Sequence, residues 1–233
     1  NTTANNNIAI GQDALTSNST GTQNIAIGSN SLLTSTTANY NVAVGYKCLE
    51  DNSTGSENTA VGANALDANT TASYNNAFGR NALTANTTGA FNNAFGAASM
   101  GSNTTGSSNV AMGYNSLGSN TIGGNNVAIG HQALTANTAS NNTAIGYNSL
   151  VSCTSGERNV AVGPRTLDAL TTAVNCTAVG ADALTALTTG NDNTAVGRES
   201  LQYCTTGYHN TAVGQEAAKV MTTGFENTCI GHE

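Results

Sequence analysis

The sequence predicts an all-β fold, namely a β-solenoid of about 14 coils with one coil for each 17-residue repeat. The first observation is a glycine that recurs from Gly11 to Gly231 every 17 residues, with one interval of 16 between Gly130 and Gly146. The second is that the apolar residues keep the same phase, which a flexible linker of similar composition would not do. The third is the repeat length, because a pair of helices needs more than about 30 residues. We therefore interpret residues 1–233 as a single repeat array, either a segment of a longer fibre or a unit that stacks end to end.

The strands are placed by numbering each repeat from the Asn of an N-x-A-φ-G core, where φ is a large apolar residue. Position 1 is Asn in 13 of 14 copies, position 3 is Ala in 13 of 14, and position 9 is Leu in 11 of 13. We expect one strand at positions 1–4, a second near positions 7–10 and a third extended piece at positions 12–14. The unvarying glycine at position 5 predicts a bend with a positive φ.

The charged residues indicate which positions face water. All 19 of them fall at positions 6, 7, 10, 11, 16 or 17. Charges are almost never buried unpaired, so these six positions are expected to lie on the surface.

The first strand is expected to bury both faces, because adjacent positions 3 and 4 are both apolar and neighbouring strand residues point to opposite sides. We expect positions 4 and 9 to fill the core. The position-3 alanines would then meet a second copy of the chain, or lie close to solvent in a monomer. The predicted interface residues are Ala9, Ala26, Ala43, Ala60, Ala77, Ala94, Ala111, Ala128, Ala144, Ala161, Ala178, Ala195 and Ala212.

The Asn at position 12 allows two interpretations. The motif N-[ST]-[ST] at Asn1, Asn18 and four later copies is an N-glycosylation signal. Later repeats place Leu, Met or Cys at this position, which favours an internal ladder of Asn amides. The predicted ladder residues are Asn18, Asn52, Asn69, Asn86, Asn103, Asn120 and Asn137, and Asn141 and Asn175 at turn positions are the better glycan candidates.

Thr columns at positions 13 and 14 suggest a third possibility, an ice- or crystal-binding surface. Such a surface needs Thr residues separated by one residue, so that both point outward. The two Thr columns here are adjacent and must diverge. A hydroxyl ladder at a corner of the coil is the simpler interpretation.

No catalytic or metal-binding constellation is present in the sequence, so we expect no enzyme activity, no metal and no cofactor. The five cysteines have no metal-ligand spacing and are interpreted as small buried residues. A net charge of −7 with only six Lys and Arg argues against a nucleic-acid partner. The absence of an 18-residue apolar run argues against membrane insertion.

The motif N-[TVI]-A-[IV]-G followed by Leu, as in Asn24–Leu32 and Asn193–Leu201, resembles the head repeats of YadA-like trimeric autotransporter adhesins. Similar arrays occur in phage tail-fibre and other surface-fibre proteins. The resemblance implies a left-handed β-roll that trimerises through its inner strand. The repeat here is longer than in those adhesin heads, by a T-T-G corner.

Together these observations predict an extracellular structural or adhesive fibre segment on a cell or virion surface. Its partners would be other copies of itself, as a trimer or an end-to-end filament, and a host-surface glycan or protein. A glycan-coated filament and an ice-binding protein are the alternatives. The exposed aromatics expected to make surface contacts are Tyr46, Tyr114, Tyr147, Tyr203, Tyr208 and Phe225.

Overall fold

The computed structural model describes residues 4–232 and is a parallel β-solenoid without helix in that range. The chain divides into two compact units. The first contains residues 4–115 together with Ser119–Ile122, and the second contains Ser116–Gly118 together with residues 123–232. The predicted fold class is confirmed, and the same coil is repeated within each unit.

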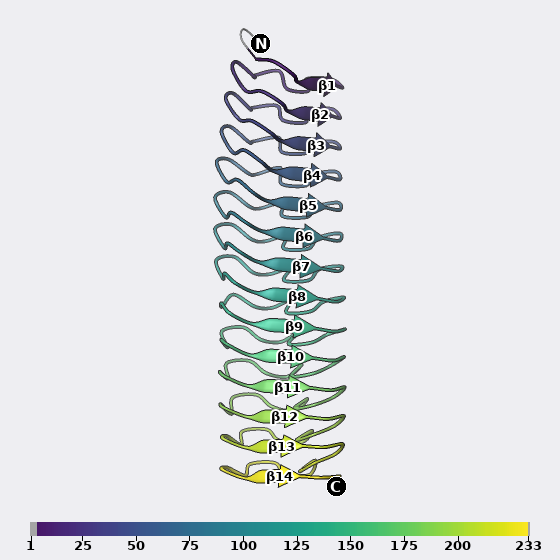
Figure 1. The fold of residues 1–233 in the computed structure, drawn as a ribbon, viewed down its shortest axis with the longest axis vertical. Helices are drawn as coiled ribbons and strands as arrows, with labels where there is room; N and C mark the ends of the chain where they lie inside the picture. The colour runs from purple at the N-terminus through teal and green to yellow at the C-terminus, as the bar shows by residue number, and fades with distance from the viewer. Residues whose placement is uncertain (1–3, 233) are drawn as a thin grey trace. The chain divides into compact units, whose positions relative to one another are not determined.

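Each coil of the first unit contributes one three-residue strand, and each strand pairs in parallel with the next (Figure 1). The pairing joins equivalent repeat positions, as in Ala26 opposite Ala43 and Ala43 opposite Ala60. The strands are β1 (Ile8–Ile10), β2 (Ile25–Ile27), β3 (Val42–Val44), β4 (Thr59–Val61), β5 (Asn76–Phe78), β6 (Asn93–Phe95) and β7 (Val110–Met112).

The second unit repeats this arrangement. Its strands are β8 (Val127–Ile129), β9 (Thr143–Ile145), β10 (Val160–Val162), β11 (Thr177–Val179), β12 (Thr194–Val196), β13 (Thr211–Val213) and β14 (Thr228–Ile230). Ala128 pairs with Ala144 across the 16-residue interval, so the shorter repeat does not disturb the strand register.

The interior of a coil is formed by positions 1, 3, 8, 9, 12 and 15. In one coil of the first unit these are Asn58, Ala60, Ala65, Leu66, Asn69 and Ala72. The position-9 side chain is the largest of them, and Leu32, Leu49 and Leu66 are fully buried. Burying one such side chain stabilises the fold by about 1.5–3 kcal/mol. The Leu at position 9 was predicted in the core, and this is confirmed.

The predicted orientation of the strand is wrong. The position-3 alanines from Ala26 to Ala212 are at most 1% exposed and point into the coil, so their side chains cannot form an interface between chains. The position-4 side chains point outward, and Ile27 and Phe78 are each 36% exposed. The physical reason is space. The position-8 side chain packs against the strand from inside the coil. Cys48 Sγ, for example, lies 3.1 Å from the Ala60 carbonyl oxygen. This close packing leaves space for only a small inward side chain at position 3.

The second and third predicted strands are also absent from the described residues, where positions 6–11 form stacked turns. These turns still bond from coil to coil. The Leu32 amide donates to the Cys48 carbonyl oxygen at 3.0 Å, and the Lys47 amide donates to the Ser29 carbonyl oxygen at 3.0 Å. Backbone groups are therefore paired around the coil although only three residues adopt strand geometry.

The tight turns require left-handed backbone conformations at three non-glycine positions of each coil. Position 9 is one of them, with φ 53° at Leu66 and Leu83, and positions 7 and 17 are the others. At position 5 the glycines have φ between 128° and 141°, as predicted. A Cβ added at Gly79 would come within 2.7 Å of the Gly96 carbonyl group, so both φ and space exclude other residues there.

The one-residue deletion is absorbed within a single corner. The side-chain Nδ2 of Asn137 donates to the carbonyl oxygen of Ala139, two residues ahead, at 2.8 Å. In a full-length repeat, Asn86 Nδ2 at the same position donates to the carbonyl oxygen of Gly89, three residues ahead, at 3.0 Å. Ala139 therefore takes the place of position 15. The residue missing from this coil is the exposed one at position 14.

Candidate interaction surfaces

The outward face of the first unit's sheet exposes a column of apolar side chains at position 4. Positions 2 and 4 alternate with the buried alanine, so both columns point outward. Phe78 and Phe95 stack with their ring centroids 4.9 Å apart, and Met112 on the next strand is 43% exposed. No charged residue occurs at positions 2 or 4. The position-4 column is therefore an exposed apolar stripe without charged residues.

In the second unit the position-2 column is Thr in five of seven strands, whereas in the first unit it is a mixture of Ile, Val, Thr and Asn. Thr177, Thr194 and Thr211 lie on adjacent strands, each separated by one alanine from an outward valine. The outward face of β11 to β13 is therefore a regular array of hydroxyl and methyl groups.

The Asn residues at position 12 form the predicted internal ladder in the first unit from Asn52 to Asn120, whereas Asn18 is separated from it by Ser35 at the same position. Asn69 Nδ2 lies 2.8 Å from Asn52 Oδ1, Asn86 continues the ladder at 3.0 Å, and Asn103 and Asn120 continue it at 2.8 and 2.9 Å. Asn18 is 1% exposed and donates to the Gly21 carbonyl oxygen at 3.0 Å. In the second unit Cys153 follows the buried Asn137, with its Sγ 3.9 Å from Asn137 Oδ1.

A second Asn ladder, at position 1, was not predicted. Asn58 is buried; its Nδ2 donates to the Ala72 carbonyl oxygen at 2.8 Å, and its Oδ1 accepts the Asn75 amide of the next coil at 3.0 Å. Each such Asn therefore closes its own coil and attaches the next one. The near-invariance of Asn within a predicted strand was the signal for it, since Asn is depleted in ordinary strands.

Among the glycosylation motifs, burial separates the candidates. The position-12 side chains from Asn18 to Asn120 lie in the interior and are inaccessible in the folded chain, and Asn1 lies outside the described residues. Asn141 and Asn175 are exposed. The Asn175 side chain is nevertheless bonded on both sides, to Arg158 Nε at 2.9 Å and to Asp192 Oδ1 at 3.0 Å.

The position-13 hydroxyls form a ladder at a corner of the coil. Thr87 Oγ1 donates to the Thr104 carbonyl oxygen at 3.0 Å, and Thr188 Oγ1 donates to the Thr205 carbonyl oxygen at 3.0 Å. These hydroxyls are occupied by backbone partners. The position-14 side chains, such as Thr54 and Thr88, are exposed.

The charged residues lie outside the core, and no Asp, Glu, Lys or Arg in the described range is buried. Several are paired along the second unit. Arg165 makes a bidentate contact with Asp182 at 2.7 and 2.8 Å, and this pairing raises the pKa of the guanidinium. Arg198 contacts both Glu199 and Glu216. Such exposed pairs contribute little to stability.

The aromatics predicted on the surface are all exposed, and they fall into separate groups rather than one patch. Tyr46, Tyr114, Tyr147 and Tyr203 are between 50% and 54% exposed. Tyr208 and Phe225 stack with ring centroids 5.3 Å apart, beside His209. A further group at position 17, Tyr40, Tyr74 and Phe91, was missed by sequence analysis. Its exposure could have been predicted, because position 17 carries charged residues in other coils and therefore faces water.

The cysteines agree with the interpretation as small interior residues. Cys48, Cys153, Cys176 and Cys204 are buried and unbridged, and Cys229 is half-buried. Burial raises the pKa of the Cys48 thiol to about 12. No group of His, Cys, Asp and Glu suited to a metal ion occurs between residues 4 and 232. The same range contains no helix long and apolar enough to cross a membrane.

Comparison with known proteins gives no family: no protein-family model and no curated protein matches this chain.

Proposed function

We propose that this chain is a structural and adhesive segment of an extracellular fibre, displayed on a cell or virion surface, in which copies assemble through the outward face of the sheet. The supporting observation is the uncharged outward face at positions 2 and 4, whose position-4 column is apolar and includes Ile27, Phe78, Phe95 and Met112 in the first unit. A second copy of the same chain is the natural occupant, because it presents an identical face with the same spacing between coils. The resemblance to trimeric adhesin heads supports a three-chain assembly. The interface residues are then the outward side chains rather than the alanines.

Adhesion is assigned to the turns. Positions 6, 7, 10, 11, 16 and 17 vary from coil to coil, while the interior positions repeat. A rigid scaffold that carries variable exposed residues suits attachment to a host glycan or protein.

The test is the solution mass of the chain, measured by light scattering together with sedimentation. We expect a mass of three chains for the natural sequence. The double variant Phe78→Lys, Phe95→Lys should give a single-chain mass, because it places charges on the apolar face. Tyr46→Lys, which changes an exposed turn residue, is the matched control and should retain the three-chain mass. A single-chain mass for the natural sequence would refute assembly through this face.

The Thr and Val array on β11 to β13 favours a second candidate function, binding to ice or another ordered surface. Each of these strands presents one Thr and one Val outward, separated by one residue, and the Thr hydroxyls repeat from strand to strand at a spacing of about 4.8 Å. Thermal hysteresis of the purified chain tests it. Freezing-point depression that is lost in Thr194→Lys would support this function, and no hysteresis would exclude it.

A further inference from the structure

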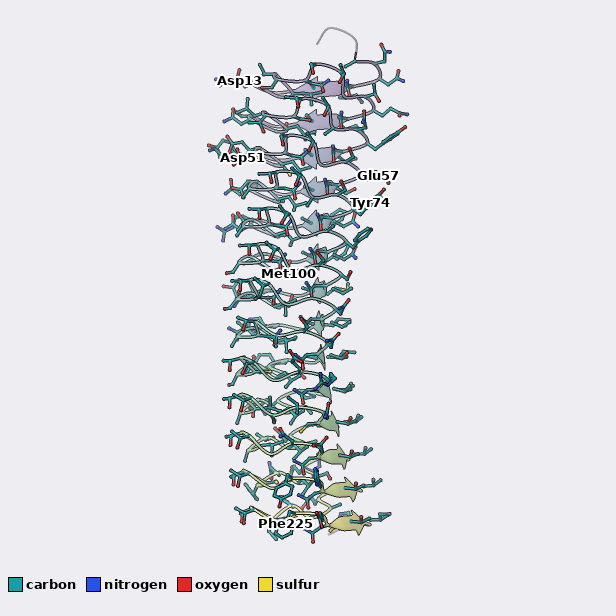
Figure 2. All side chains as sticks on the ribbon, turned by 90° about the vertical axis from the view of Figure 1, so that its left-hand side faces the viewer. Asp13, Asp51, Glu57, Tyr74, Met100 and Phe225 are labelled. Atoms are coloured by element: carbon teal, nitrogen blue, oxygen red, sulfur yellow. The ribbon has the colours of Figure 1, made fainter. Side chains whose placement is uncertain are left out.

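The position-17 column of the first unit contains a group of four side chains that the fibre scaffold does not require. Tyr40, Glu57, Tyr74 and Phe91 follow one another in consecutive coils. Tyr40 and Phe91 are each 56% exposed, and Tyr74 is 46% exposed. Glu57 and Tyr74 project on the same side of the first unit (Figure 2).

The backbone at these residues is unfavourable for aromatic side chains. The four residues have φ between 58° and 63°, in the left-handed region that Asn adopts more readily than bulky residues. Other coils place Asn there, as at Asn125 and Asn141. The fold therefore requires the left-handed backbone but not aromatic rings. Exposed rings at such a position indicate a use other than folding.

Contacts within the group link Phe91, Tyr74 and Glu57. Phe91 stacks on Tyr74 with ring centroids 5.0 Å apart and an interplanar angle of 2°. The neighbouring Glu57 carboxylate raises the pKa of the Tyr74 hydroxyl. The Phe91 ring thus supports Tyr74, which in turn interacts with Glu57.

Tyr40 and Glu57 line a shallow, open pocket of about 510 Å³. The backbone beneath is fixed, because the Glu57 amide donates to the Asn39 carbonyl oxygen at 3.0 Å and the Asn39 amide donates to Ser56 Oγ at 3.0 Å. No Lys or Arg occupies positions 16 or 17 of the first unit, and Glu57 has no ion pair among the described residues.

We propose that this pocket binds an organic cation, an alkylated ammonium group that lies against the Tyr40 ring and pairs with the Glu57 carboxylate. An aromatic face attracts a cation within about 6 Å of its centroid, and methyl groups on the nitrogen add apolar contact with the ring. The carboxylate supplies the compensating charge on the other side. A neutral sugar would use the ring but would gain nothing from the charge. This site does not depend on the assembly proposed above, since it is contained within one chain.

The experiment is a titration of the full chain with choline, followed by the NMR signals of Tyr40 and the choline methyl groups. We expect weak, saturable binding that salt weakens. The neutral alcohol 3,3-dimethylbutanol has nearly the same shape as choline and should bind at least fivefold more weakly. Choline carries a trimethylammonium group and N-acetyl-lysine methylamide carries a primary ammonium group. Comparing their affinities identifies which kind of ammonium group the pocket prefers.

Variants separate the roles of the residues. Glu57→Gln and Tyr40→Leu should each weaken choline binding by about five- to tenfold, the effect of losing one charge pair or one cation–π contact. Tyr40→Phe should retain binding, which shows that the ring rather than the hydroxyl is required. Tyr74→Phe keeps the stack on Phe91 and removes the hydroxyl that interacts with Glu57, so it should weaken binding to an intermediate degree.

The matched control is Glu226→Gln, which removes a carboxylate at the same repeat position in the second unit. It should leave choline binding unchanged. The proposal is overturned if choline does not perturb Tyr40, if Glu226→Gln weakens binding as much as Glu57→Gln, or if 3,3-dimethylbutanol or methyl glucoside binds as well as choline. Circular dichroism of each variant verifies that the fold is intact.

Discussion

The position-5 glycine shows how strongly a single residue can constrain this fold. Gly79 has a φ of 132°, and a Cβ at this position would lie 2.7 Å from backbone atoms of Gly96. Any side chain there must push two coils apart as well as adopt a forbidden backbone conformation. The lack of variation at this position predicts the conformation, whereas the contact with the next coil is visible only in the structure.

We therefore expect Gly79→Ala to lower the free energy of unfolding by at least about 2–3 kcal/mol. Gly101→Ala is the control, because Gly101 lacks a positive φ. A Cβ added there would lie 3.3 Å from its nearest neighbour, the Ala98 carbonyl oxygen. That variant should change stability by less than about 1 kcal/mol. Urea unfolding of both variants measures the difference. Equal stabilities would show that the coils separate without cost.

The buried cysteines give a pH-dependent prediction at the same scale. Burial raises the pKa of Cys48 to about 12 and that of Cys153 and Cys176 to about 11, so these thiols stay protonated at pH 8. Only the thiolate reacts with disulfide reagents. We expect the half-buried Cys229 to react quickly and the four buried thiols to react only after unfolding.

The same shifts lower stability in alkali. The folded chain holds these thiol protons more tightly than the unfolded chain, whose thiols titrate near pH 9.0. Their contribution is therefore complete below pH 9 and is lost as pH rises toward the folded values of about 11–12. Replacing Cys48 by Ala should reduce this loss. A slope of stability against pH above 9 that is unchanged in this variant would contradict the assignment.

At the scale of the element, the structural unit is the ladder rather than the isolated coil. Asn86 donates to Asn69 at 3.0 Å and accepts from Asn103 at 2.8 Å, so its amide connects three coils. Ladders of this kind stabilise stacked strands because each amide finds both partners on its neighbours. In the second unit, buried apolar residues such as Leu170 and Leu187 replace Asn at position 12.

Substitution within the ladder should therefore be costly. We expect Asn86→Ala to lower the free energy of unfolding by about 1–3 kcal/mol, because it removes the Asn86 Nδ2 group that donates to the buried side-chain oxygen Oδ1 of Asn69. Thr88→Ala removes an exposed side chain from the same coil and should change stability by at most about 0.5 kcal/mol. Thermal or urea unfolding distinguishes them. Similar losses for both variants would mean that the ladder contributes nothing.

The sequence predicted the elements unevenly, for physical reasons. Repetition made the coil, the exposed charges and the Asn ladder predictable, because each position was sampled in up to 14 copies. The prediction of the strand's orientation was wrong because the bulkier apolar residue, at position 4, was expected to point inward. Position 3 is small because the coil is narrow there, with Cys48 or Ser149 packed opposite the alanine backbone. Tyr followed by Glu in consecutive copies of position 17 occurs once in the sequence, at Tyr40 and Glu57, so the repeat pattern could not reveal this pocket.

At the scale of the molecule, each coil pairs with its immediate neighbours within a unit, so the stability of a unit should approximate a sum over its coils and the interfaces between them. Equivalent positions pair across 17 residues throughout the first unit, as Ala43 with Ala60 and Ala60 with Ala77. The array should therefore accept the loss of a whole repeat. Removing residues 53–69 joins Asn52 directly to Thr70, which restores position 12 followed by position 13.

We expect this 17-residue deletion to fold, with the same circular dichroism per residue and a smaller urea dependence of the unfolding free energy. The contrasting deletion, residues 53–68, leaves Asn69 as an extra residue beside Asn52 in the buried column. That residue would displace one amide from the ladder, so this variant should lose several kcal/mol. The natural 16-residue repeat avoids this problem because its missing residue is the exposed one at position 14. If both deletions unfold at the same urea concentration, the in-register ladders do not determine stability.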